Sequence, residues 1–173
     1  HSVGITLLLD AVYKYLPSPK EREVVIVDSS AEQGVRRIEP SQEAPLAALV
    51  FKTSADPYVG KLTYFRVYTG SIDSNSQVWN ATQGSLERIG QLFTVRGKAQ
   101  EPVSQLGAGD IGAVAKLSLT STGDTLSTRD HPVKIAPILF PGPSFSKAVY
   151  PKTKADLDKL GAALSRLTEE DPT

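Results

Sequence analysis

Short apolar stretches, separated at regular intervals by turn residues, fill the middle of this chain and constrain its fold more than any other feature. The clearest are rich in Val, Phe, Tyr, Leu and Ile, and several alternate apolar with polar residues: Leu46–Lys52, Lys61–Tyr68, Gln77–Asn80, Glu87–Val95 and Ile111–Lys116. Turn signals such as Asp56-Pro57, Thr69-Gly70 and Arg96-Gly97 lie between them. A spacing of about 8–12 residues without an intervening helical pattern predicts an antiparallel β-barrel.

Amphipathic helical patterns flank the predicted barrel. Apolar residues recur at three- and four-residue spacing within residues 2–16, and Pro17 and Pro19 end that pattern. Near the other end, Thr153 and Asp156 predict a capping box, in which each side chain satisfies a backbone N–H at the helix start. The helix that follows has an apolar stripe made of Leu157, Leu160, Leu164 and Leu167.

The connecting segments complete the expected order of elements. Residues 20–42 have the composition of an extended, partly ordered linker with one β-rich run, Val24–Val27. Residues 131–173 read as a proline-rich crossing, a strand at Phe145–Tyr150 and the capped helix, which is how a split β-α-β domain begins. Neither apolar helix stripe has a partner element beyond it. We therefore expect a piece of a larger protein, with exposed apolar area unless the stripes pack on the barrel or a neighbour.

Composition excludes several kinds of chemistry. The chain has no cysteine, which excludes disulfides, thiolate nucleophiles and cysteine-based zinc sites. Its two histidines, His1 and His131, are poorly placed for a metal site or a Ser-His-Asp triad. The 19 basic and 19 acidic residues cancel, which argues against nucleic-acid binding driven by bulk charge but leaves room for a local basic face. The phosphate-binding pattern G-x-x-x-x-G-K-[ST] is absent, and no apolar run approaches the roughly 20 residues of a membrane helix.

Idiosyncratic local motifs follow one another in a fixed order along the chain. They read PLAALVFK at 45–52, DPYVGKL at 56–62, RVYTG at 66–70, ERIGQL at 87–92, AGDI at 108–111 and TGDTL at 122–126. GITLLLDAVYKYLPSP precedes this set at 4–19, and YPKTKADLDKLGAALSRLTEEDPT follows it at 150–173. In order and spacing the set resembles elongation factor G, a translational GTPase, or a close elongation-factor-G-like paralogue. The chain departs from that family at 92–98, where LFTVRGK replaces an LRMHA-like run.

The resemblance implies a domain plan. Residues 1–16 would be the terminal helix of the GTPase domain, 17–43 a linker, and 44–131 the translation-factor-type β-barrel called domain II. Residues 132–173 would be the crossing segment and the first strand and helix of the ferredoxin-like domain III. The implied fold class is mainly β, an antiparallel barrel flanked by an N-terminal helix and a C-terminal strand-helix piece.

The resemblance also implies a role. This part of the protein would be non-catalytic and would hold no cofactor, since GTP and magnesium belong to the parent's GTPase domain. It would dock on RNA and protein of the small ribosomal subunit during translocation, relay the state of the GTPase domain, and contact its own GTPase domain and domains III–V. The parent would be cytoplasmic, with no membrane partner.

Basic residues on the predicted strands are the candidate contacts with ribosomal RNA. They are Lys61, Arg66, Arg88, Arg96 and Lys98. Arg and Lys commonly contact phosphates, so this role fits a docking barrel, whereas solvated surface charge is the alternative for each residue. Arg96-Gly97-Lys98 is the strongest candidate, because a glycine turn can place two cations in an RNA groove.

Other residues admit both a functional and a structural interpretation. Trp79, Tyr64 and Tyr68 could stack on bases, or they could pack in the core or at a sheet edge. Asp110 and Asp124 could be paired carboxylates, but each follows a glycine in a turn, where Asp commonly accepts hydrogen bonds from local backbone.

Two further readings of the whole chain stay open. An independent RNA- or oligonucleotide-binding barrel predicts measurable affinity with a steep salt dependence. A small-molecule-binding barrel predicts a ligand-sized apolar cavity. The terminal leucine stripe could also be a helix that binds in a partner's groove.

Overall fold

The computed structural model describes residues 3–21, 24–27, 35–56 and 60–171. Helix α1 (Ile5–Tyr15) and the short 3-10 helix η1 (Pro19–Glu21) come first, and η2 (Lys154–Asp156) and α2 (Leu157–Glu170) come last. The strands between them are β1 (Val24–Val27), β2 (Val35–Ile38), β3 (Ala47–Asp56), β4 (Gly60–Thr69), β5 (Ser71–Asp73), β6 (Gln77–Asn80), β7 (Ser85–Arg88), β8 (Leu92–Arg96), β9 (Ala99–Val103), β10 (Gln105–Gly107), β11 (Ile111–Ala115), β12 (Thr125–Ser127) and β13 (Lys134–Ile135).

Antiparallel strands enclose the main core and confirm the predicted barrel. One sheet has the order β7-β6-β12-β3-β4-β11-β8-β9, and β5 pairs with β10 beside it. Strands from both sheets send apolar side chains into one shared cluster, including the fully buried Val50, Phe65, Leu92 and Leu126. Alternation along β4 explains how the strand does this, because Phe65 and Val67 face the core while their neighbours are only half-buried.

The β3–β4 ladder contains two register shifts that compensate one another. Strand β4 carries one extra residue, Tyr68, and β3 carries one extra residue, Phe51. The pairs on either side of the shifts are Ala47 with Thr69 and Ala48 with Val67, then Val50 with Phe65 and Lys52 with Tyr64. Beyond the second shift the register is the same as before the first. Such bulges bend and twist a strand locally and change where its side chains point.

A small second sheet covers part of the outer barrel surface. Strand β1 pairs antiparallel with both β2 and β13. Its Ile26 packs with Ile135 of β13 and with Ala47 and Leu49 of β3 in a separate core cluster. The segment expected to be a linker thus contributes two strands, because its β-rich runs can bury apolar side chains on the barrel.

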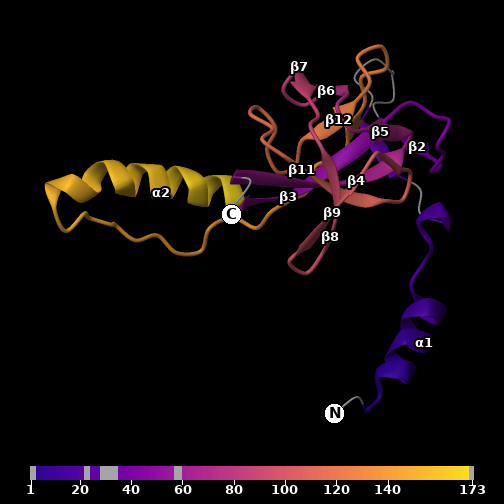
Figure 1. The fold of residues 1–173 in the computed structure, drawn as a ribbon, viewed down its shortest axis with the longest axis horizontal. Coiled ribbons are helices and arrows are strands. Elements are labelled where there is room, and N and C mark those ends of the chain that lie inside the picture. Colours follow the sequence, from indigo (N-terminus) through magenta and orange to yellow (C-terminus); the bar gives the residue numbers. More distant parts are fainter. Residues whose placement is uncertain (1–2, 22–23, 28–34, 57–59, 172–173) are drawn as a thin grey trace.

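The C-terminal segment leaves the barrel and returns to it. After β13 the chain runs outward without secondary structure, and α2 leads back toward the β3–β4 hairpin (Figure 1). The predicted strand at Phe145–Tyr150 is wrong, because no strand in the described part of the chain lies beside it to pair. The predicted capping box is also wrong in detail: the Thr153 hydroxyl donates to the Asp156 carboxylate at 2.7 Å, and neither side chain caps a backbone N–H.

Both helices project from the barrel (Figure 1). Neither helix contains a buried residue. Leu157, Leu164 and Leu167 of α2 are 59%, 45% and 56% exposed. The expectation of exposed apolar area is therefore confirmed. In the described residues, no helix is both long enough and apolar enough to cross a bilayer.

Candidate nucleic-acid interface

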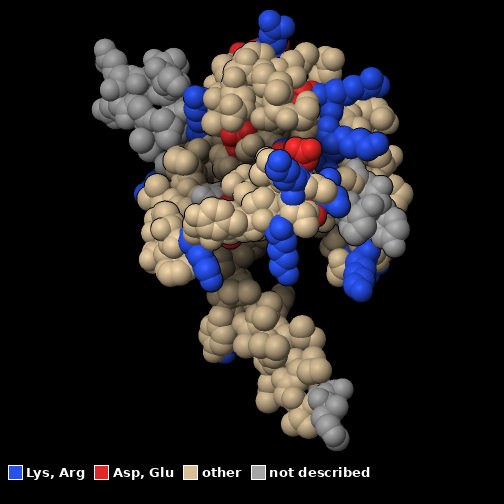
Figure 2. All heavy atoms as spheres, turned by 90° about the vertical axis from the view of Figure 1, so that its left-hand side faces the viewer, with Lys and Arg blue, Asp and Glu red and all other residues tan. Residues whose placement is uncertain are grey.

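The five basic residues proposed from the sequence do not form one cluster. Lys61 and Arg66 lie on β4, Arg88 ends β7, and Arg96 and Lys98 lie in the β8–β9 hairpin. Strands β7 and β9 are opposite edges of the large sheet, so these residues are distributed around the barrel. Figure 2 shows Lys and Arg side chains in separate positions over one face, with acidic side chains between some of them.

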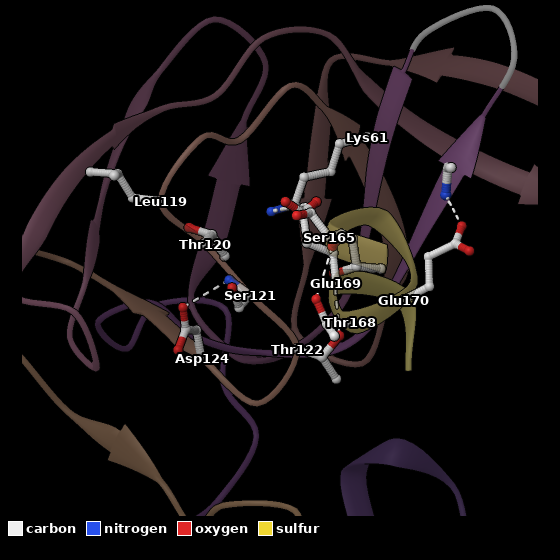
Figure 3. Close-up of polar contacts among 12 residues, drawn as sticks. Lys61, Leu119, Thr120, Ser121, Thr122, Asp124, Ser165, Thr168, Glu169 and Glu170 are labelled. Carbon is white, nitrogen blue, oxygen red and sulfur yellow. Dashed lines mark hydrogen bonds and ion pairs between the residues drawn. The ribbon is translucent and has the colours of Figure 1, made fainter. Parts of the chain in front are cut away.

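Lys61 is held by helix α2. Its ammonium lies 3.6 Å from the Glu169 carboxylate, and its side chain is only 19% exposed. The neighbouring Glu170 carboxylate accepts a hydrogen bond from the backbone N–H of Ala55 on β3 (Figure 3). These residues and Arg166 line an open cleft between α2 and the hairpin. Lys61 therefore connects the end of α2 to the barrel in this structure.

The β8–β9 hairpin presents two exposed cations of the predicted set, Arg96 and Lys98. Its two-residue turn depends on Gly97, whose φ of +60° is a left-handed conformation that favours glycine. Arg96 forms an ion pair with Glu101 across the hairpin. Lys98, at the tip, is exposed and has no carboxylate partner within the described chain. Sequence reasoning correctly placed these cations at a glycine turn but could not foresee the partner of Arg96.

Arg66 lies against an aromatic ring instead of a carboxylate. Its guanidinium carbon is 5.2 Å from the ring centroid of Tyr68 on the same strand. Its Nε is buried and has no hydrogen-bond partner among the described residues. Tyr68 in turn packs against the second core cluster. The stacking contact therefore holds a cation on the outer face of β4 without neutralising it.

Trp79 is half-buried on β6 and belongs to the barrel wall. The Arg129 guanidinium lies 5.8 Å from its ring centroid, and its backbone carbonyl accepts a hydrogen bond from the Ser127 hydroxyl at 3.4 Å. Half-burial places Trp79 in the barrel wall, and its alternative role as a stacking residue stays a prediction.

Asp110 and Asp124 have the predicted turn role. The Asp110 carboxylate accepts from the Gly107 backbone N–H at 2.8 Å, and that of Asp124 accepts from the Ser121 N–H at 2.9 Å. Figure 3 shows the second of these contacts. The carboxylates thus shape the loops that contain them.

A buried polar network around Asp124 was missed from the sequence. Asn80 is fully buried and donates to the Asp124 carboxylate at 2.9 Å and to the Thr120 hydroxyl at 3.1 Å. Glu87, only 5% exposed, accepts from the Leu119 N–H at 2.6 Å and from Thr120 at 3.1 Å. Across the described ranges, no three His, Cys, Asp or Glu residues group as metal ligands would.

Comparison with known proteins gives two matching family models and a similar solved structure. The model of elongation factor G domain 2 matches residues 45–129, and that of elongation factor G domain III matches residues 140–173. A crystal structure of a protein from Thermus thermophilus is 30% identical over 98% of this chain, with a TM-score of 0.72. The chain spans 23% of the length of that protein.

Proposed function

The chain belongs to the elongation-factor-G-like family, and from this premise we propose that it is the non-catalytic docking part of a translational GTPase. The barrel would bind RNA and protein of the small ribosomal subunit during translocation. Hydrolysis of GTP, with its magnesium ion, would take place in a GTPase domain outside these residues, in the cytoplasm. The match to two consecutive domains of elongation factor G carries this proposal.

The β8–β9 hairpin supports a docking role. Lys98 lies at its tip, exposed and without a carboxylate partner in the described chain, and Arg96 precedes it. A protruding turn that carries cations can reach phosphates that a flat surface cannot. RNA contacts of this kind position a protein on the backbone without reading sequence.

The contact between Pro19 and Gly109 supports the proposed relay of the GTPase domain's state to the barrel. Pro19, after α1, lies against the turn at Gly109, where an added Cβ would come within 2.9 Å of the proline side chain. The Gly109 N–H donates to the Val67 carbonyl at 2.8 Å, and Val67 follows Arg66 on β4. A shift of the segment after α1 would thus be passed to a strand that carries a candidate RNA contact.

Binding to isolated small ribosomal subunits across a salt series tests the proposal. We expect weak, salt-sensitive binding, no binding of GTP, and further weakening by Lys98→Glu. The slope of log K against log salt is negative, and each lost phosphate contact should make it shallower by about 0.7–0.9. Lys152→Glu makes the same charge change at an exposed site away from the barrel and should leave binding unchanged.

Two results would contradict the proposal. Tight binding of GTP by this chain would overturn the division of roles. Subunit binding that is absent at every salt concentration, or that is equally weakened by Lys98→Glu and Lys152→Glu, would remove the barrel's docking role.

A further inference from the structure

We propose that the outer face of β3 and β4 binds an unpaired stretch of nucleic acid by base stacking combined with phosphate contacts. This surface, the ring face, consists of Phe51, Lys52, Tyr64 and Arg66. The inference rests on the proposed docking function and adds to it a second, chemically distinct contact surface. Of these four residues, the sequence had put forward Arg66 as a phosphate contact and Tyr64 as a stacking residue.

Two rings lie together on this face. The ring centroids of Phe51 and Tyr64 are 6.5 Å apart, with their planes tilted by 43°. Phe51 is the extra residue of the β3 bulge and is 37% exposed. Phe51 thus adds an accessible ring beside Tyr64, and every nucleic-acid base has a face that can stack on such a ring.

Cations accompany the rings and lack acidic partners. The Lys52 ammonium lies 5.8 Å from the Tyr64 ring centroid, and the Arg66 guanidinium lies 5.2 Å from that of Tyr68. Within the described part of the chain, neither Lys52 nor Arg66 forms an ion pair with a carboxylate. The face therefore carries positive charge beside its rings although the whole chain has a formal net charge of zero.

This combination favours a single strand as the occupant. Stacking rings contribute only when bases are exposed, which is true of loops, bulges and unpaired ends but not of a duplex interior. Cations beside the rings meet the phosphates of the same strand, whereas an apolar protein partner would leave them unpaired. The arrangement thus matches the two kinds of contact that single-strand-binding barrels use.

Fluorescence anisotropy with a short labelled oligouridylate tests the inference on the 173-residue chain. Tyr64→Leu and Phe51→Ser should each weaken binding about tenfold, in the range expected for loss of one stacking contact. Tyr64→Phe should bind like the unchanged chain. Lys52→Gln should reduce the salt slope by about 0.7. A duplex RNA of the same length should bind more weakly than the single strand.

Matched variants outside the ring face make the result specific. Tyr150→Ser removes a ring that is 83% exposed, and Lys147→Gln removes an exposed cation; neither should change binding. The inference is overturned if Tyr64→Leu and Phe51→Ser, shown to be folded by their circular dichroism, bind the oligouridylate as tightly as the unchanged chain. It is also overturned if the duplex binds as tightly as the single strand.

The two proposals can fail separately. Subunit binding that depends on Lys98, with no effect of the ring-face variants on oligouridylate, leaves the docking function and removes this inference. Oligouridylate binding that depends on the ring face, without any subunit binding, retains the site and removes the docking function.

Discussion

At the scale of single residues, the barrel holds its buried carboxylates with neutral donors. Asp124 is 3% exposed and receives hydrogen bonds from the Asn80 amide, the Gln83 amide and the Ser121 backbone. A buried charge is tolerated when enough donors surround it, and removal of one donor leaves an unsatisfied group. These contacts join β6 to the loop before β12, so the network fixes the shape of one end of the barrel.

Asn80→Ala should lower the free energy of unfolding by about 2–4 kcal/mol. The change removes donors to Asp124 and Thr120 and also the amide oxygen that accepts the backbone N–H groups of Thr82 and Gln83. Urea denaturation measures the effect. Gln105→Ala, which removes exposed amide hydrogen bonds, should change the same quantity by less than about 0.5 kcal/mol. Equal effects of the two substitutions would show that burial of the network does not matter.

Sequence predicts such residues only when their contacts are local. The turn roles of Asp110 and Asp124 were predictable because each carboxylate accepts from a backbone N–H three residues away. The Thr120 and Asp124 side chains that accept from the Asn80 amide nitrogen lie 40 and 44 residues away, and the helix partner of Lys61 lies still farther along the chain. Contacts of that kind depend on the completed fold. Because the sequence did not reveal Glu169 as the partner of Lys61, Lys61 was interpreted as a cation available for RNA.

At the scale of elements, α2 is attached to the barrel mainly at its C-terminal end. The Glu170 carboxylate accepts the Ala55 N–H, and Glu169 pairs with Lys61 (Figure 3). Leu157, Leu164 and Leu167 of α2 remain exposed, so the helix gains little from apolar burial. Partly exposed ion pairs stabilise weakly, typically by less than about 1 kcal/mol, and salt screens them.

Glu170→Ala should make the backbone amide of Ala55 exchange with solvent faster, by about fivefold if the hydrogen bond contributes about 1 kcal/mol. Hydrogen exchange followed by NMR measures this at one amide. Glu170→Gln keeps an acceptor oxygen and should protect Ala55 better than Glu170→Ala does. The amide of Val50, in the barrel core, should not respond to either change. Unchanged exchange at Ala55 in Glu170→Ala would mean that α2 does not hold the hairpin in solution.

The periodic elements were the most predictable part of the fold. Alternation and turn residues located β3, β4, β6 and β11 to within a few residues, because a half-buried strand imposes a period of two. The run Glu87–Val95 was expected as one strand but divides into β7 and β8, with Ile89 buried between them. The strand expected at Phe145–Tyr150 has no pairing neighbour in the described part of the chain, and pairing is what local sequence cannot report.

At the scale of the whole molecule, one well-packed barrel carries two projecting helices. The large core cluster belongs to the barrel, whereas α1 and α2 contain no buried residue. Isolated helices of 11 and 14 residues are marginal in water, because most helical stability in proteins comes from packing. Unfolding should therefore not be a single cooperative event.

Thermal unfolding should show the helical circular-dichroism signal decreasing before the barrel signal changes. The only tryptophan, Trp79, lies on β6, so its fluorescence reports the barrel alone. Leu126→Ala, at a fully buried site, should destabilise the fluorescence transition by about 2–5 kcal/mol and leave the helical transition in place. Leu164→Gln should leave the fluorescence transition unchanged. Coincident transitions in the unchanged chain would contradict this division.

The two compensating bulges of β3 and β4 have a consequence for how this sequence can change in length. Deletion of Phe51 alone, or of Tyr68 alone, would leave one uncompensated register shift in the ladder between the strands. Deletion of both would restore a continuous ladder. Among related sequences, a one-residue gap at one bulge should accordingly be accompanied by a gap at the other. The two bulge residues should therefore be gained or lost together, although they lie on different strands.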